Sequence, residues 1–160
     1  MHRLLIPLAI LAATAFNPAH ADSDREVRVP LLAAYKQECG ACHTAYAPGL
    51  LPVASWARLM DTLPRHFGAD ASLDAAMLKT LQTWLAHNAG TRRRAQEAQE
   101  AQEAPPEDRI TRAPRFVREH RELAPEVWQR AAVGNASNCA ACHTQADAGR
   151  YSEHDVRIPR

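Results

Sequence analysis

Two copies of the pattern Cys-x-x-Cys-His, at residues 39–43 and 139–143, constrain this chain more than any other feature. In such a segment the two thiols add to the vinyl groups of a haem, and the histidine that follows binds the iron from one side. All four cysteines of the chain lie in the two motifs, so none remains for a disulfide. The pattern therefore predicts two covalently bound c-type haems. The expected thioether residues are Cys39, Cys42, Cys139 and Cys142, and the expected proximal ligands are His43 and His143.

Cysteine pairs also occur as redox dithiols and as zinc ligands, and two pairs together can form a four-thiolate zinc site. A histidine directly after both pairs is superfluous in such a site. The motifs also begin 100 residues apart, at positions 39 and 139, which exceeds the spacing of small zinc modules. We therefore favour haem attachment over zinc or dithiol chemistry.

The N-terminus has the features of an export signal. A short basic start precedes an apolar run over residues 4–15, and Ala19-His20-Ala21 supplies the small residues of a cleavage site. The apolar run is short for a bilayer span, although a retained membrane anchor is the alternative. Because c-type haem is attached after export, we expect residues 1–21 to be a signal peptide and the mature chain to reside in the periplasm.

The charge balance does not favour a nucleic-acid partner. The formal net charge is +1, and no basic patch stands out. The carboxylates of two haems would make the loaded protein mildly acidic. Arginine greatly outnumbers lysine, which occurs only at Lys36 and Lys79, and the planar guanidinium suits haem propionates.

Hydrophobic periodicity predicts a mostly α-helical fold, which we expect to be organised around the two haems. No stretch shows the sustained alternation of a β-strand. An arginine run and a threefold Ala-Gln-Glu repeat, followed by two prolines, divide the chain. We expect an N-terminal haem lobe over 22–91, a polar linker over 92–108 and a C-terminal haem lobe over 109–160.

Several helix ends are suggested by capping residues. We expect Ser55 to cap one helix, and Asp70 or Ser72 to open a longer one that ends near Gly90. The apolar face of the longer helix comprises Leu73, Met77, Leu81, Trp84 and Leu85.

In the C-terminal lobe, Thr111 is expected to cap a helix with Pro114 in its first turn. Phe116 and His120 then lie four residues apart on one face. A further helix is expected to begin at Pro125.

The ligand on the second side of each iron decides the function. An iron closed by two protein ligands exchanges electrons, whereas an open iron binds oxygen, peroxide, nitric oxide or nitrite. The remaining candidates in the mature chain are His66, His87, His120, His154, Met60 and Met77.

Position along the chain favours two of these candidates. His66 lies at a helix exit soon after the first motif, and His120 lies on a helix before the second. Met60 is a weaker rival to His66, whereas Met77 fits the apolar face of a helix. His87 and His154 fit exposed positions.

The stretch over residues 39–56 resembles the first haem segment of the small periplasmic dihaem cytochromes c. Residues 66–74, Ile110-Thr111-Arg112, His120 and the segment from Asn138 to Pro159 are similar to the same family. The resemblance spans essentially the whole mature chain, and it departs at residues 92–106.

This resemblance implies two low-spin haems, each with bis-histidine ligation. Carried onto this chain, His66 would be the second ligand of the first haem and His120 that of the second. The order along the chain suggests this assignment, and a crossed arrangement stays open. The resemblance also implies electron supply from a membrane b-type cytochrome and donation to an oxygen-binding monohaem cytochrome c.

We therefore expect an electron-transfer protein rather than an enzyme, with redox proteins as partners and without an integral membrane span in the mature chain. A dihaem peroxidase or nitrite reductase would need an open iron and an acid–base residue above it. A gas or redox sensor, in which one distal histidine is displaced, is the other alternative.

Overall fold

The computed structural model describes residues 29–89 and 104–160. The expected signal peptide and residues 92–103 of the expected linker lie outside these ranges. Within them, all regular elements are helical, and pairing of extended backbone is limited to two isolated bridges, His66 with Ala69 and His143 with Val156. The prediction of a mostly α-helical fold is confirmed. No helix of the described part is long and apolar enough to cross a membrane.

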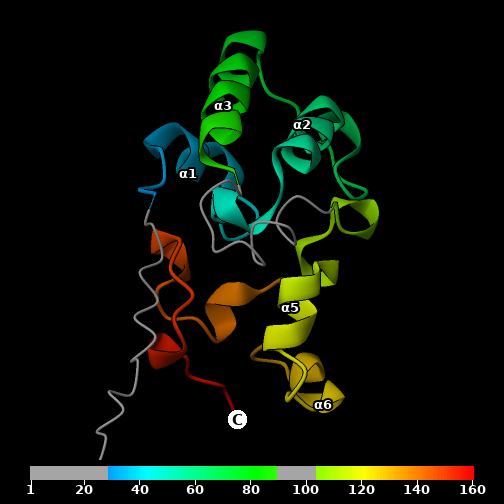
Figure 1. The fold of residues 1–160 in the computed structure, drawn as a ribbon, viewed down its shortest axis with the longest axis vertical. Coiled ribbons are helices and arrows are strands. Elements are labelled where there is room, and N and C mark those ends of the chain that lie inside the picture. Colours follow the sequence, from blue (N-terminus) through cyan, green and yellow to red (C-terminus); the bar gives the residue numbers. More distant parts are fainter. Residues whose placement is uncertain (1–28, 90–103) are drawn as a thin grey trace, which may run out of the picture.

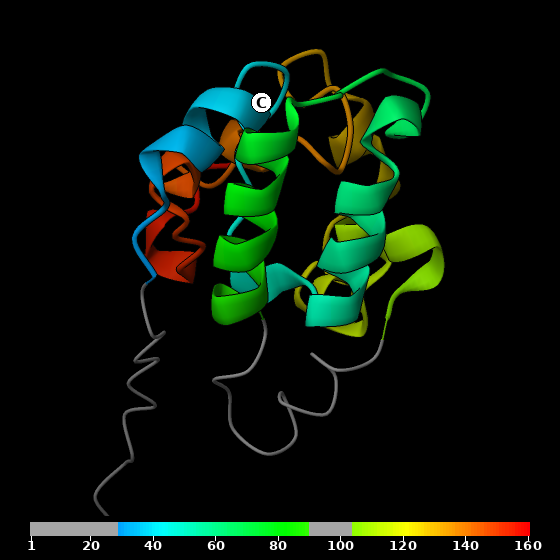
Figure 2. The same cartoon turned by 90° about the horizontal axis from the view of Figure 1, so that it is seen from above.

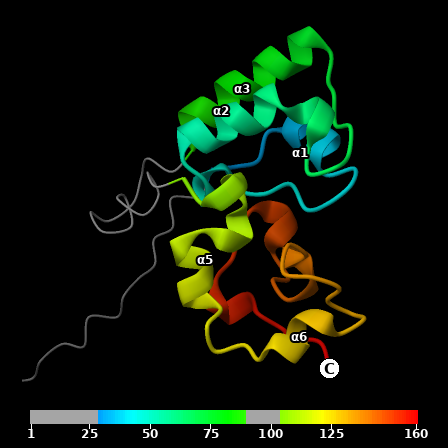
Figure 3. The same cartoon turned by 90° about the vertical axis from the view of Figure 1, so that its right-hand side faces the viewer.

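Over residues 29–89 and 104–160, five α-helices are joined by short 3-10 turns (Figure 1). The α-helices are α1 (Ala33–Cys39), α2 (Val53–Asp61), α3 (Ala75–Asn88), α5 (Pro114–Glu119) and α6 (Pro125–Gln129). The 3-10 turns are η1 (Pro48–Leu50), η2 (Leu63–Arg65), η3 (Pro106–Asp108), η4 (Ile110–Arg112), η5 (Cys139–Ala141), η6 (Ala146–Ala148) and η7 (Glu153–Asp155). Figures 1 and 3 both place α1 to α3 at one end of the molecule and α5, α6 and the C-terminal turns at the other.

The main core lies between the first three helices, with α2 beside α3 (Figure 2). Tyr35 of α1 is its centre, because its ring meets Trp56 edge-on at 6.4 Å and Trp84 at 4.9 Å. The expected apolar face is confirmed for the four members that lie in α3: Leu81 and Leu85 are buried, and Met77 and Trp84 pack against the core. The fifth, Leu73, packs against the same core but precedes the helix. Burial of this face stabilises the helix more than its intrinsic propensity does.

The start of α3 differs from the prediction. Asp74 is the N-cap, and its carboxylate accepts from the backbone N–H groups of Ala76 and Met77, both at 2.9 Å. Asp70 instead accepts from the backbone and hydroxyl of Ser72, at 2.9 and 2.6 Å. This local turn satisfies Asp70 outside the helix, so the helix begins four residues later than a cap at Asp70 would place it, and two residues later than a cap at Ser72. The helix ends at Asn88, and Gly90 lies outside the described residues.

The prediction that Ser55 caps α2 is wrong. The helix begins at Val53 after Pro52, whose φ of −67° and ψ of 157° already suit the residue before a helix. Ser55 is fully buried inside the first turn. The indole of Trp56 donates to the Pro48 carbonyl at 2.7 Å and fixes the helix against the preceding turn.

In the C-terminal half, proline sets the helix starts. Pro114 is the first residue of α5 and Pro125 the first of α6, as predicted. Thr111 does not cap α5, because it lies within η4 and Ala113 occupies the cap position. The fixed φ of proline therefore determines these boundaries without a side-chain cap.

The described end of the expected linker packs against the N-terminal helices. The guanidinium of Arg58 in α2 donates to both carboxylate oxygens of Asp108, at 2.5 and 2.9 Å. Glu107, beside it, pairs with Arg109 and Arg112. The chain is thus anchored to α2 before it enters the C-terminal half.

Candidate haem sites

The first motif begins at the last residue of α1, where Cys39 ends the helix. Gly40 follows, and a side chain there would collide with the backbone carbonyl of Lys36. Glycine therefore lets the chain leave the helix tightly, and Cys42 and His43 emerge on the surface. Burial, followed by the nearby Glu38 charge, raises the pKa of the Cys39 thiol to about 11, so this thiol is protonated at neutral pH.

The second motif is a single tight turn. Cys139 opens η5, and the backbone N–H of His143 donates to the Cys139 carbonyl at 2.8 Å. This bond closes one helical turn over the motif and places both thiols and the imidazole on one segment. Burial raises the pKa of the Cys139 thiol to about 11 as well.

Each motif histidine faces a second histidine from another part of the chain. The ring centroids of His43 and His66 are 6.1 Å apart, and their planes meet at 23°. Those of His120 and His143 are 6.0 Å apart, with planes at 71°. The described residues thus bring the four predicted axial ligands together in two pairs. His66 lies opposite the histidine of the first motif and His120 opposite that of the second, which is the predicted assignment and not the crossed one.

The ring separations test whether an iron fits between the members of a pair. Metal–imidazole bonds of about 2 Å on both sides, plus about 1 Å from each nitrogen to its ring centre, give roughly 6 Å between centroids. Both pairs match this separation. Two imidazoles on one axis can rotate about it freely, so planes at 23° and at 71° are both compatible with shared ligation.

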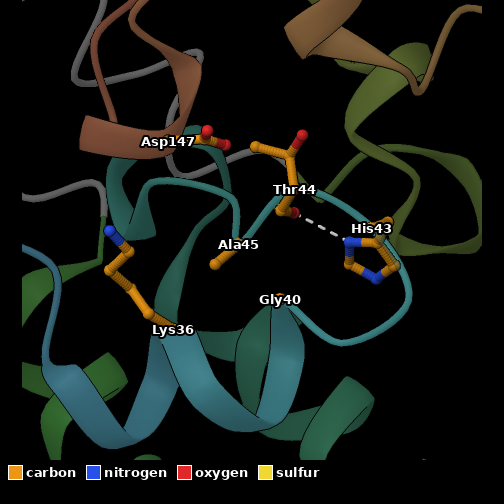
Figure 4. Close-up of a pocket in the computed structure, with 6 residues that line it drawn as sticks. All are labelled: Lys36, Gly40, His43, Thr44, Ala45 and Asp147. Atoms are coloured by element: carbon orange, nitrogen blue, oxygen red, sulfur yellow. Dashed lines mark hydrogen bonds between the residues drawn. The ribbon is translucent and has the colours of Figure 1, made fainter.

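Backbone carbonyls select the tautomer of one ring in each pair. His43 Nδ1 lies 2.8 Å from the Thr44 carbonyl oxygen (Figure 4), and His120 Nδ1 lies 2.8 Å from that of Phe116. Because a carbonyl only accepts, Nδ1 must carry the proton in both rings. The lone pair is then on Nε2, the atom available to a metal.

Burial favours the neutral form of the other two rings. Burial lowers the pKa of His66, and the neighbouring His43 adds to the effect. Burial likewise lowers the pKa of His143, with His120 as the second cause. A lower pKa favours the uncharged imidazole, which is the form that binds metal.

The remaining candidates lie elsewhere. Met60 is buried in the apolar core, and Met77 packs against the same core. His87 is exposed and bonds the Thr83 carbonyl, and His154 is exposed near the C-terminus. Within the described ranges, no cluster of three or more His, Cys, Asp and Glu side chains is arranged to hold a metal ion, as a four-thiolate zinc site would require.

Tyr46 is a site residue that the sequence analysis did not identify. Its ring stacks on His43, with centroids 4.8 Å apart and planes at 19°. Its hydroxyl donates to the Ser137 carbonyl at 2.7 Å, just before the second motif. The Tyr35 hydroxyl in turn donates to the Tyr46 carbonyl at 2.8 Å. An aromatic residue three positions after the motif histidine was the available signal, and it does not reveal the distant partner.

An open pocket beside the first motif also joins the two halves (Figure 4). Lys36, Gly40 and His43 line it from the first half, and Asp147 of η6 lines it from the second. The first motif therefore lies beside η6 of the C-terminal half.

Comparison with known proteins agrees with this arrangement. Residues 35–151 match the family model for dihaem cytochrome c. The structure is similar to that of a diheme cytochrome type c from Shewanella baltica OS155, with a TM-score of 0.68 and 32% identity over 82% of this chain and 95% of that one. No functionally curated protein matches the chain.

Two structures of diheme cytochrome c from Rhodobacter sphaeroides are also similar. One has a TM-score of 0.63 and 40% identity, covering 77% of this chain and 99% of that chain. The other has a TM-score of 0.62 and 37% identity, covering 77% and 100%. The chain therefore belongs to the dihaem cytochrome c family, a group of electron-transfer cytochromes with two covalently bound c-type haems.

Proposed function

We propose that this protein is a periplasmic electron carrier whose two haem irons are each closed by two histidines. The thioether residues are Cys39 and Cys42 for the first haem, and Cys139 and Cys142 for the second. The axial ligands are His43 with His66, and His143 with His120. The observation that carries the proposal is the separation of about 6 Å within both histidine pairs.

Haem supplies one-electron chemistry when bound, and the protein's residues control access and orientation. The carbonyls of Thr44 and Phe116 orient His43 and His120 with Nε2 available. Burial lowers the pKa of His66 and of His143 and so favours their uncharged forms. A pair of imidazoles also favours a lower reduction potential than a histidine–methionine pair.

Each half of the chain supplies one histidine pair, and we assign one haem to each half. In our proposal, residues 22–91 hold the first haem, residues 109–160 hold the second, and residues 92–108 connect them. The contact between Arg58 and Asp108 supports a fixed end to that connection.

The proposed location of the protein rests on its N-terminal sequence, and its proposed partners rest on the family resemblance. Residues 1–21 would direct export and be removed, leaving the mature protein in the periplasm. A membrane b-type cytochrome would supply electrons, and an oxygen-binding monohaem cytochrome c would accept them.

The ligand set is tested by electron paramagnetic resonance of the ferric holoprotein. The wild type should show two low-spin haems. His66→Ala and His120→Ala should each convert one haem to high spin, whereas the control His87→Ala should convert neither. Retention of two low-spin haems in either of the first two variants would show that the substituted histidine is not a ligand.

The role is tested by mixing the reduced protein with an oxidised, oxygen-binding monohaem cytochrome c in a stopped-flow instrument. We expect both haems to be oxidised, one electron at a time, with matching reduction of the acceptor. Steady turnover of hydrogen peroxide or nitrite by the wild type, without such transfer, would favour a dihaem enzyme instead.

A further inference from the structure

The two distal histidines are supported very differently by their surroundings. His66 and His120 have the same role in the proposed function, each opposite a motif histidine. Ligand strength depends on the contacts of the ring as well as on its distance from the metal. The two residues can therefore be compared as a matched pair within one protein.

His120 is held on several sides. It directly follows α5, and its Nδ1 bonds the Phe116 carbonyl at 2.8 Å. Its ring stacks on the Phe116 ring at 4.0 Å and 20°, and it also contacts Trp128 at 5.7 Å. A hydrogen bond and two aromatic contacts thus fix both the position and the rotation of this imidazole.

His66 has fewer supports. Its Nδ1 is buried, and no hydrogen-bond acceptor among the described residues lies within reach of it. Apart from His43, the aromatic ring that its imidazole contacts among the described residues is that of the adjacent Phe67, with centroids 4.9 Å apart and planes at 61°. Phe67 itself is 48% exposed, and its ring packs against the guanidinium of Arg109, 4.4 Å from the ring centroid, rather than against the apolar core.

The backbone that carries His66 is also strained. Residues 66–69 form a tight turn, in which the Ala69 N–H donates to the His66 carbonyl at 3.1 Å. Both central residues have positive φ, 51° for Phe67 and 96° for Gly68. Glycine suits such a position, but a bulky phenylalanine is an outlier there. Strain of this kind is found at ligand clamps and switch regions.

We propose that His66 is the exchangeable axial ligand of this protein, and that a neutral diatomic ligand of ferrous iron, such as carbon monoxide or nitric oxide, binds at the first haem in its place. The second haem stays closed by His120. The inference rests on the proposed ligand set and goes beyond electron transfer, since it gives one haem a ligand-binding site.

The proposed exchange replaces one neutral ligand of the iron, the His66 imidazole, by another, the diatomic molecule. The bond between the iron and His66 Nε2 breaks, and a bond between the iron and the diatomic ligand forms. His66 leaves as a neutral imidazole with its own lone pair, and the oxidation state of the iron is unchanged. In our proposal, a change of backbone conformation within residues 66–69 carries His66 away from the haem, and it relieves strain if Phe67 leaves its φ of 51°.

The test uses carbon monoxide and the dithionite-reduced holoprotein. The infrared C–O stretching bands of His66→Ala and His120→Ala provide reference positions for the first and the second haem. Wild-type protein titrated with carbon monoxide should show the band of the first haem. At half saturation, the amount of carbon monoxide bound to the first haem should exceed the amount bound to the second by at least about tenfold. This is the factor expected from the one hydrogen bond and the aromatic contacts that hold His120.

A matched pair of variants tests the contribution of packing. Phe116→Ala removes the ring that stacks on His120 and should allow carbon monoxide to reach the second haem. Val117→Ala, at a 56% exposed position of the same helix, should leave the second haem closed. If Phe116→Ala fails to fold, Trp128→Leu removes the other aromatic contact of His120 and serves the same purpose.

Three results would overturn the inference: no carbonyl band in the wild type, a band at the second-haem position, or equal bands at both. These results leave the proposed function standing, provided that each histidine-to-alanine variant has one high-spin haem. If His66→Ala keeps both haems low-spin, the ligand set itself fails, and the inference fails with it.

Discussion

The Tyr46 hydroxyl donates to the Ser137 carbonyl at 2.7 Å and so joins the two haem motifs across 91 residues of sequence. The same tyrosine stacks on the imidazole of His43. Burial raises the pKa of Tyr46, with the nearby Cys139 thiol as a further cause, so the hydroxyl is protonated and able to donate at neutral pH. One side chain thus contacts the expected proximal ligand of the first haem and the segment that leads into the second.

Tyr46→Phe is expected to weaken the connection between the motifs while keeping the stacked ring. Loss of one such hydrogen bond should lower the free energy of unfolding by about 1 kcal/mol. Guanidinium unfolding of the holoprotein, followed by helical circular dichroism, measures the change. Tyr46→Leu also removes the stacking and should cost more. Equal stability of the wild type and Tyr46→Phe would mean that the bond contributes nothing in water.

The orientation of the imidazole planes predicts two distinct ferric signals. In the first pair the planes are 23° apart, so both rings act mainly on the same iron d orbital and split the orbital pair. In the second pair they are 71° apart, so the two rings act on both orbitals and leave them close in energy. Axial ligands tune the iron in this way.

We therefore expect a rhombic low-spin signal from the first haem and a more anisotropic one, with a larger maximum g value, from the second. Low-temperature electron paramagnetic resonance distinguishes them. His66→Ala should abolish the rhombic signal, and His120→Ala the anisotropic one. Two identical rhombic signals in the wild type would contradict the plane angles.

Much of the fold was predictable because its signals are local. The apolar period of α3 and the prolines that begin α5 and α6 act over a few residues. Helix starts marked only by Ser, Thr or Asp were less reliable, because Asp70 forms a turn with Ser72 and leaves the cap of α3 to Asp74. Two neighbouring residues with the same capping chemistry compete, and the surrounding packing decides between them.

In the candidate site, too, features with a local sequence signal were predictable, whereas contacts between distant segments were not. Few histidines remain once each motif supplies one, so their positions along the chain, together with the family resemblance, led to His66 and His120. The stacking of Phe116 on His120 follows from their spacing of four residues. The bond from Tyr46 to Ser137 has no local signal in either segment, because it depends on how distant turns meet. The positive φ of Phe67 was likewise hidden, since Phe does not favour that backbone region.

Removal of one motif thiol tests the covalent attachment. Cys142→Ser should leave the second haem held by a single thioether or lost, because only Cys139 remains to react in that motif. Intact-protein mass spectrometry under denaturing conditions reports how much haem stays attached. Cys39→Ser is the corresponding change in the first motif. Two haems, each bound through two thioethers, in either variant would contradict the motif assignment.

Asp74 should contribute measurably to stability through the cap of α3. Asp74→Ala leaves the backbone N–H groups of Ala76 and Met77 without their side-chain acceptor, and should destabilise the protein by about 1 kcal/mol. Asp74→Ser retains an acceptor and should restore most of the loss. Chemical unfolding monitored by circular dichroism measures both. An unchanged midpoint in Asp74→Ala would show that water replaces the cap at no cost.

The pairing of Asp108 with Arg58 predicts a dependence of stability on pH in the acid range. Hydrogen bonding from Arg58, with Ser55 as a further donor, holds the pKa of Asp108 below its usual range. A carboxyl with a depressed folded-state pKa binds protons less readily when folded. Its contribution to stability is therefore fully present above the ordinary Asp pKa of about 3.9 and is lost as the pH falls through the lower, folded-state value.

Asp108→Asn should accordingly reduce stability at pH 7 and make the protein less sensitive to a change from pH 5 to pH 2.5. The urea midpoint at each pH measures this difference. Arg58→Gln removes the partner, so adding Asp108→Asn to that background should have a smaller effect than in the wild type. The effects of the two substitutions would simply add if Arg58 were not the main cause of the lowered pKa. In that case the anchoring of residues 106–108 to α2 would depend on backbone packing rather than on charge.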